Sequence, residues 1–184
     1  NGSVFAAGDN IYFNRGGQWR EQLNIPASSI TLGAYGTGAK PIINGADIET
    51  GWVSAGSNLW YINNPNAVTT RAMVIISSTI YEEVLSLATL TSANKYFIDV
   101  STTPDRLYVY STVDPSSVVA EISNREYCIS TALGASSKRF ITIEDIEVRY
   151  AGRAGIYFEG PGTSVSDALN GSSTVRRCTA YANR

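Results

Sequence analysis

Histidine is absent from the 184 residues of this chain. Because imidazole is the usual general base of nucleophilic catalysis and a common zinc ligand, its absence excludes Ser-His-Asp and Cys-His systems and the usual zinc sites. Cysteine is scarce as well, and Cys128 and Cys178 lack the CxxC spacing of a zinc site. Two cysteines are too few for a disulfide scaffold, and we favour two buried free thiols over a bridge between them.

Charged residues are also sparse, at 16% of the chain against about 25% in ordinary domains. The net charge is −2, and no run of Lys and Arg is longer than the pair Arg176 and Arg177. A nucleic-acid partner requires a basic stripe, so we expect none. No segment approaches the roughly 18 apolar residues of a membrane span, so we expect no span either.

The first residue is Asn rather than Met, and no basic segment followed by an apolar one comes after it. Either a leader has been removed or the segment was excised from something longer, and both interpretations are compatible with a secreted protein. Asn1 and Asn170 each begin an Asn-Gly-Ser tripeptide, which fits the acceptor pattern for N-glycosylation.

What the chain does contain is a series of short alternating runs separated by Gly, Asn, Asp and Ser. Examples are residues 10–13 (Asn-Ile-Tyr-Phe), 29–32 (Ser-Ile-Thr-Leu) and 40–43 (Lys-Pro-Ile-Ile). Such runs indicate short β-strands at close spacing, so we predict an all-β fold. Residues 82–90 come nearest to a helical pattern, and we predict a loop or one short turn there.

Three regions differ in composition. Residues 1–50 combine short strands with Gly-rich turns, and the short-strand pattern returns over residues 120–184. Residues 51–119 hold longer strands rich in Trp and Tyr, with turn-forming residues at 63–66 and 102–105. These features are typical of antiparallel hairpins, so we predict an inserted antiparallel β subdomain between two parts of one architecture.

A repeat becomes visible in the last region when residues 173–183 are placed under residues 141–151. Apolar residues then fall over apolar ones at an offset of 32 residues: Ile143 over Val175, Ile146 over Cys178 and Val148 over Ala180. The step from Ile143 to Ile146 breaks strict alternation, which predicts a bend at Glu144 and Asp145 within a coil of several strands. The side chains expected to point inward are Ile143, Ile146, Val148, Ile156, Phe158, Val175, Cys178 and Ala180.

Residues 140–152, 155–158 and 175–183 resemble successive rungs of the pectin-lyase-like right-handed parallel β-helix superfamily. Residues 7–13 are similar to the entry coil of those proteins, and the strand at 106–111 resembles part of a subdomain inserted in some members. The resemblance implies the N-terminal portion of a right-handed parallel β-helix, or β-solenoid, with an antiparallel β-rich insertion. It also implies a carbohydrate-associated protein that is extracellular or on the cell surface. Members include polysaccharide lyases, glycoside hydrolases, phage tailspikes and adhesins, so the fold does not settle the function.

No catalytic residue follows from the resemblance, because no local motif of the superfamily's lyases is present. Glycoside hydrolysis requires two carboxyl groups about 5 to 10 Å apart. The carboxyl groups that could be so placed are those of Glu144, Asp145, Glu147 and Glu159. The repeat places Arg176 over Glu144 and Arg177 over Asp145, so for these two carboxyls we favour cross-rung ion pairs over catalysis.

We expect no metal and no cofactor. Calcium binding requires several oxygen ligands in one loop. The oxygen-bearing groups considered for it, Asp9 with Asn10 and Asn14, or Asp145 with Glu147, are too sparse to form such a loop.

A saccharide-facing patch is the site that the pattern itself suggests. Tyr150 and Tyr157 alternate with residues expected to point inward, which would place both rings on the outside. Aromatic rings provide an apolar platform for the face of a sugar. The candidate patch consists of Tyr150, Tyr157, Glu147, Arg149 and Arg153.

Three classes of function follow. We favour part of a secreted polysaccharide lyase or glycoside hydrolase whose catalytic residues lie outside this segment, so that the isolated segment is inactive. The alternatives are a structural subunit of an extracellular fibre or adhesin, and a glycan-binding module without catalysis. The last coil stops incomplete at Arg184, so we expect its edge to be covered by further chain or by a neighbouring subunit.

Overall fold

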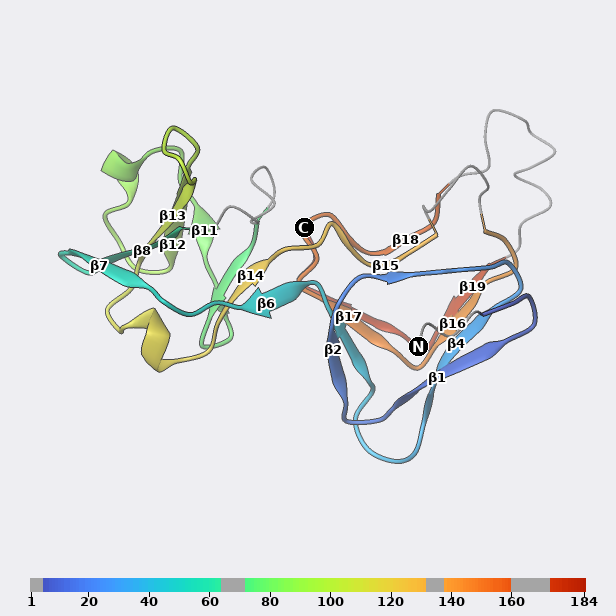
Figure 1. Ribbon diagram of the computed structural model, residues 1–184. Coiled ribbons are helices and arrows are strands. Elements are labelled where there is room, and N and C mark those ends of the chain that lie inside the picture. Colours follow the sequence, from blue (N-terminus) through green and yellow to red (C-terminus); the bar gives the residue numbers. More distant parts are fainter. Residues whose placement is uncertain (1–4, 64–71, 132–137, 160–172) are drawn as a thin grey trace. The chain divides into compact units, whose positions relative to one another are not determined.

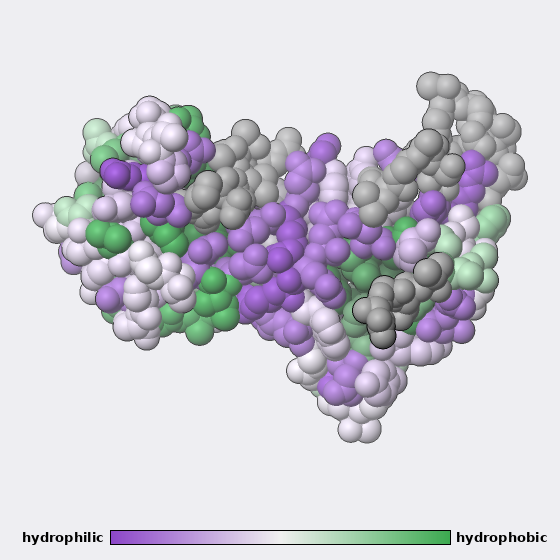
Figure 2. All heavy atoms as spheres, viewed as in Figure 1, coloured by the Kyte–Doolittle hydropathy of each residue, from purple (hydrophilic) through white to green (hydrophobic). Residues whose placement is uncertain are grey.

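The computed structural model describes residues 5–63, 72–131, 138–159 and 173–184 (Figure 1), and Figure 2 shows the hydropathy of their surface in the same view. Contacts divide the chain into two units, Asn1–Gly45 with Arg125–Arg184, and Ala46–Asn124. The described residues are almost entirely strands and turns, which confirms the prediction of an all-β fold. None of the helices in these ranges has the length and apolar character needed to cross a membrane. Asn1, Asn170 and most of the predicted turn at 63–66 lie outside the described residues.

Three parallel sheets form the first unit. The first sheet contains β1 (Asn10–Asn14), β4 (Thr31–Tyr35), β16 (Thr142–Glu144) and β19 (Thr174–Arg176). The second contains β2 (Gln18–Arg20), β5 (Ile42–Asn44), β17 (Glu147–Arg149) and β20 (Thr179–Tyr181), and the third contains β3 (Leu23–Asn24), β15 (Tyr127–Ser130) and β18 (Ala154–Tyr157). The chain visits the sheets in the same order on each pass. The second unit is inserted between β5 and β15, and β15 supplies the third-sheet strand of that pass.

Strand pairing confirms the predicted register of 32 residues. Ile143 pairs in parallel with Val175, and Val148 pairs in parallel with Ala180. The predicted bend is also present, because β16 ends at Glu144 and Asp145 has a φ of 58°. The equivalent residue of the next pass, Arg177, has a φ of 54°. Both passes bend at equivalent residues whose backbone lies in the left-handed region. Their strands therefore stay in register on either side of the bend.

Side chains from all three sheets share one core. Leu32 and Ile143 come from the first sheet, Ile43 and Val148 from the second, and Ile129 from the third. Ile146 is fully buried with them, and Ile156, Phe158 and Cys178 pack against the same core and are partly buried.

The last pass is less buried than the sequence pattern suggests. Val175 is 46% exposed, whereas its partner Ile143 is 0% exposed. Ala180 is exposed as well. Both residues keep the predicted register, but β19 and β20 have a described neighbour strand on one side only, so their side chains lack a covering layer.

The two cysteines are free thiols, as expected, and Cys128 is buried while Cys178 is only partly buried. Burial raises the pKa of the Cys128 thiol to about 11. This thiol is therefore uncharged at neutral pH and is part of the apolar core.

Two further sheets form the second unit and enclose a separate core. One contains β6 (Ala46–Ile48), β9 (Val74–Ile76), β10 (Thr79–Ile80) and β14 (Ala120–Ser123). The other contains β7 (Val53–Gly56), β8 (Leu59–Asn63), β11 (Glu82–Glu83), β12 (Lys95–Asp99) and β13 (Arg106–Tyr110). All described pairs in this unit are antiparallel, as predicted, except the parallel pair of β11 and β12.

Two short 3-10 turns complete the second unit. The first, η1 (Leu87–Thr89), follows β11 and matches the short turn predicted within residues 82–90. The second, η2 (Pro115–Ser117), begins after Asp114, whose side chain accepts a hydrogen bond from the backbone N–H of Ser116.

Candidate functional site

The five residues predicted to face a saccharide lie on two different sheets. Glu147 and Arg149 lie on β17, and Tyr150 follows that strand. Arg153 precedes β18, and Tyr157 ends it. The structure therefore divides the predicted patch into two clusters with different neighbours.

The cluster around β17 has a buried aromatic ring. Arg149 Nη1 lies 3.8 Å from Glu147 Oε1, and Arg149 Nη2 donates a hydrogen bond of 2.9 Å to Gln18 Oε1. Tyr150 is only 4% exposed, so the prediction that it stands outside is wrong. The physical reason is that β17 ends at Arg149 and Tyr150 has a φ of 61°, so strand alternation does not extend to it.

The cluster at β18 is built on two stacked rings. The centroids of Tyr127 and Tyr157 lie 4.4 Å apart with an interplanar angle of 16°. Arg153 Nη1 donates a hydrogen bond of 2.8 Å to the Tyr127 hydroxyl, and its guanidinium carbon lies 6.0 Å from the Tyr157 ring centroid. Tyr127 covers one face of the Tyr157 ring, and Tyr157 is only partly exposed.

A third aromatic surface, on the outside of the first sheet, was missed by the sequence analysis. Tyr12 is 51% exposed and Tyr35 is 56% exposed. Phe13 and Leu32 are in the core, so alternation turns Tyr12 and Tyr35 to the opposite face of the sheet. Asn14 on β1 pairs directly with Tyr35 on β4, which places the two tyrosines on neighbouring strands of one face.

Gly33 is the residue that lets the Tyr12 ring lie close to the sheet. Tyr12 pairs with Gly33 across the two strands. A Cβ atom at position 33 would lie 2.9 Å from Tyr12 Cε1 and 3.5 Å from Glu144 Cγ. A larger residue would therefore displace the ring, which borders Glu144 across the glycine.

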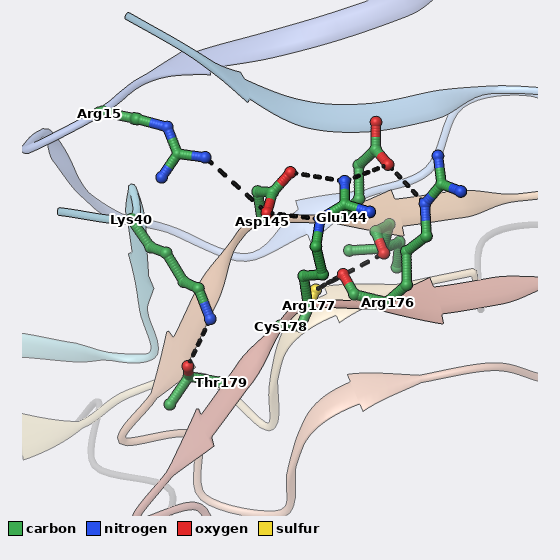
Figure 3. A network of polar contacts seen from close by, with 9 residues as sticks. Arg15, Lys40, Glu144, Asp145, Arg176, Arg177, Cys178 and Thr179 are labelled. Carbon is green, nitrogen blue, oxygen red and sulfur yellow. Dashed lines mark hydrogen bonds and ion pairs between the residues drawn. The ribbon is translucent and has the colours of Figure 1, made fainter. Parts of the chain in front are cut away.

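Charged side chains extend this face toward the corner of the sheet (Figure 3). Arg176 Nε donates to Glu144 Oε2 at 2.6 Å, and Arg177 Nη2 donates to Glu144 Oε2 at 2.9 Å and to Asp145 Oδ2 at 2.8 Å. Arg15 Nη2 lies 3.8 Å from Asp145 Oδ1. The predicted pairs, Arg176 with Glu144 and Arg177 with Asp145, are thus confirmed.

These contacts determine the protonation of both carboxyl groups. Hydrogen bonds, from Arg176 above all for Glu144 and from Arg177 for Asp145, hold the pKa of each carboxyl below its usual value. The general acid of glycoside hydrolysis requires a raised pKa. Glu144 and Asp145 are therefore suited to remain ionised and to hold the arginines in place.

The corner carries more positive than negative charge. Besides the arginines, Lys40 lies beside it and donates a hydrogen bond of 2.9 Å from Nζ to Thr179 Oγ1 (Figure 3). Arg15 and Lys40 both act electrostatically on Asp145. Four cationic side chains thus face two carboxylates, and the surplus is available to an anionic group on a ligand.

Of the remaining candidates from the sequence, Asn14 lies beside Tyr35, and Glu159 and Asp9 make other contacts. Glu159 is exposed, and its backbone N–H donates to Thr131 Oγ1 at 2.8 Å. Asp9 Oδ2 accepts a hydrogen bond of 2.7 Å from the backbone N–H of Ala6. Within the described ranges, no group of three or more His, Cys, Asp or Glu side chains could hold a metal ion.

Comparison with known proteins supports the fold. No protein-family model and no curated protein matches the chain. Among solved structures, it is similar to one described as the complex structure of XylC with xylose, with a TM-score of 0.69 and 19% sequence identity. The match covers 82% of this chain but only 31% of the XylC chain, so this chain spans less than a third of that protein. At this identity the likeness shows a shared β-rich fold with parallel sheets.

Proposed function

We propose that the chain is part of a secreted, carbohydrate-associated protein and contacts a glycan with the outer face of its first sheet. The observation that carries the proposal is the pair of exposed rings, Tyr12 and Tyr35, on adjacent strands. The amide of Asn14 and the ion pairs around Glu144 lie beside them. Aromatic rings cover the apolar face of a sugar, while flanking polar groups bind its hydroxyls.

The architecture behind this face is proposed to be a right-handed parallel β-helix of the pectin-lyase-like kind. Three parallel sheets visited in a constant order around one core support this assignment. The likeness to XylC, whose structure was determined with xylose, supports a carbohydrate ligand for this architecture. The location would then be extracellular or on the cell surface.

The chemistry of the face favours binding over catalysis by this segment. Its two carboxyl groups, those of Glu144 and Asp145, have lowered pKa values and so do not supply the general acid of a glycoside hydrolase. Polysaccharide lyase or glycoside hydrolase activity of the parent protein would therefore depend on residues outside this segment. The cation surplus at the corner favours a glycan that carries acidic groups.

The test is calorimetric titration of the 184-residue protein with hexagalacturonate, an acidic oligosaccharide, and with xylohexaose, a neutral one of equal length. Tyr12→Ala and Tyr35→Ala should each weaken hexagalacturonate binding by about tenfold, because each removes one stacking ring. Gly33→Ala should weaken it as well, since the new Cβ displaces the Tyr12 ring.

Tyr181→Ala is the matched control, because Tyr181 is 49% exposed but lies on β20 of the second sheet. Its affinity for hexagalacturonate should equal that of the unaltered protein. Loss of affinity in Tyr181→Ala, with unchanged affinity in Tyr12→Ala and Tyr35→Ala, would instead assign the glycan to the surface near Tyr150 and Arg149 and refute the proposed face.

A second candidate function, a subunit of an extracellular fibre or adhesin, is favoured by the exposed edge of β19 and β20. Val175 is 46% exposed on an edge strand, and such an edge can pair with a further strand from the same chain or from a neighbouring subunit. Sedimentation of the 184-residue protein should then show polymers, and Val175→Lys should reduce them. A stable monomer at high concentration would contradict this second function.

A further inference from the structure

The five-stranded sheet of the second unit has one face in the core and an unusual opposite face. Tyr96, Leu107 and Val109 are buried in the core of that unit, and Trp60 packs against them. Side chains alternate along a strand, so the residues between these positions project from the other face. That face is the outer face of β12, β13 and β8.

An unbroken aromatic row crosses this outer face. Phe97 pairs with Tyr108, and Tyr108 pairs with Tyr61, so three rings follow one another across three strands. The ring centroids of Tyr61 and Tyr108 lie 5.6 Å apart at an angle of 40°. Tyr61 in turn pairs with Val53, which is 45% exposed on β7.

The row is partly open to solvent. Tyr108 is buried between its neighbours, whereas Phe97 and Tyr61 are only partly buried. The outer face of an antiparallel sheet is ordinarily polar, so rings at three paired positions call for a partner that covers apolar surface.

Polar groups surround the row, and their charges balance. The Arg106 guanidinium carbon lies 4.9 Å from the Tyr61 ring centroid, and Arg106 Nε donates to Asn63 Oδ1 at 3.3 Å. Asp99 pairs with Arg106 across the strands and interacts with it electrostatically. On the other side of the row, Lys95 Nζ lies 4.0 Å from Glu82 Oε2.

The balance of positive and negative charges around the row argues against polyanionic ligands. Nucleic acid and anionic membranes are bound by a surplus of cations, which these paired charges do not provide. A neutral sugar chain presents apolar ring faces for stacking and hydroxyl groups for hydrogen bonds, and both find partners here. We infer that the outer face of β12, β13 and β8 is a second glycan-binding surface, specific for neutral glycan chains.

This surface is independent of the function proposed for the first sheet, because it lies in the other unit and takes a neutral rather than an acidic ligand. The experiment titrates the 184-residue protein with xylohexaose and with hexagalacturonate. Tyr61→Leu and Phe97→Leu keep apolar bulk on the sheet but remove a ring. Each should weaken xylohexaose binding by about tenfold and leave hexagalacturonate binding unchanged.

Tyr61→Phe provides the matched control, since it keeps the ring and should bind xylohexaose within about twofold of the unaltered protein. Circular dichroism of each variant checks that the sheets are intact. Absence of xylohexaose binding in the unaltered protein, or equal binding in the two leucine variants, would overturn the inference. It would also be overturned if those variants changed only the sedimentation of the protein, because the face would then join copies of this chain.

The outcomes for the two surfaces are separable. Xylohexaose binding that is lost in Phe97→Leu and retained in Tyr12→Ala supports the inference, whatever happens with hexagalacturonate. Xylohexaose binding that is lost in Tyr12→Ala and retained in Phe97→Leu overturns it, and leaves a glycan site on the first sheet alone.

Discussion

The first unit pairs strands that lie a full pass apart in the sequence, whereas the second unit pairs several strands that follow one another. β16 pairs with β19 at a separation of 32 residues, and β7 pairs with β8 across a tight turn. A parallel pair needs a long connection, and an antiparallel pair can be joined by a short hairpin. One chain thus contains two β architectures whose sequence signatures differ: a long-range repeat in the first unit, and local alternation with turn residues in the second.

The two architectures also differ in how their cores end. In the first unit, buried residues such as Ile143 recur from pass to pass, and the row ends at the exposed Val175. In the second unit, the two sheets face each other across residues such as Val74 and Leu107. A stacked core has an end that needs a covering layer, and a sandwich core is covered by its own two sheets.

The largest effects should come from cavities in the two cores. Ile143→Ala in the first unit and Leu107→Ala in the second should each cost about 2 to 5 kcal/mol in free energy of unfolding, because both side chains are almost completely buried. Val175→Ala should cost much less, because that side chain is 46% exposed. Urea denaturation measures the three values.

Hydrogen exchange locates each effect, and the accelerated amides should lie in the unit that carries the substitution. A Val175→Ala cost as large as that of Ile143→Ala would show that the end of the stacked core is covered in solution. The contrast between the two core types would then disappear.

Intermediate effects should follow from removing hydrogen bonds to buried backbone. Asn183 Oδ1 accepts from the backbone N–H of Ala151 at 3.0 Å, and its Nδ2 donates to the Val148 carbonyl oxygen at 3.2 Å. Asn183→Ala should therefore cost about 1 to 3 kcal/mol, because it leaves backbone groups of a corner without partners. Thermal unfolding of Asn183→Ala and of the unaltered protein measures the difference.

In the second unit, the Tyr96 hydroxyl donates to the Ala72 carbonyl oxygen. Tyr96→Phe keeps the ring in the core and should cost about 0.5 to 1.5 kcal/mol, less than Asn183→Ala. The Tyr96 hydroxyl has one proton to share between the Ala72 carbonyl oxygen and Glu83 Oε2, whereas the Asn183 amide both donates and accepts. Thermal unfolding measures both costs. A larger loss of stability for Tyr96→Phe than for Asn183→Ala would show that hydrogen bonds from side chains to backbone contribute more stability in the second unit than in the first.

The smallest effect should be the dependence of stability on acid pH. The folded pKa values of Glu144 and Asp145 lie below their ordinary values of 4.5 and 3.8, so their ion pairs stabilise the fold fully above those values. The contribution is lost as the pH falls through the lower folded pKa values, because the unfolded chain takes up protons first. The two carboxyl groups are partly exposed, so the effect is modest and is weakened by salt.

Unfolding measured between pH 6 and pH 2 should show less acid destabilisation in the Glu144→Gln, Asp145→Asn double variant than in the unaltered protein. Asp99→Asn in the second unit is the comparison variant. Hydrogen bonds from Ser101, rather than from an arginine one pass away, are the main cause of the lowered Asp99 pKa. An identical pH profile for the double variant would mean that the corner network contributes nothing to folding.

Much of the first unit could be predicted because side chains alternate along each strand and stacked strands repeat. The register from Ile143 to Val175, the corner at Asp145, and the pairs of Glu144 with Arg176 and Asp145 with Arg177 all follow from that rule. The candidate site was less predictable. Tyr150 was expected outside because alternation was extended past Arg149, where the backbone in fact turns a corner.

The strand period is enough to predict short strands, their inward-facing positions and the stacking of residues 173–183 over residues 141–151. These properties depend on the period of a strand, which is local. Three features depend on long-range contacts instead: Tyr35 lies across from Asn14, Tyr127 covers Tyr157, and β15 joins a third sheet after the insertion of Ala46–Asn124. Those contacts join residues whose separation is set by the turns and loops between them. The period of a strand does not specify which other strand lies beside it. A surface formed by two strands therefore depends on how the strands pair.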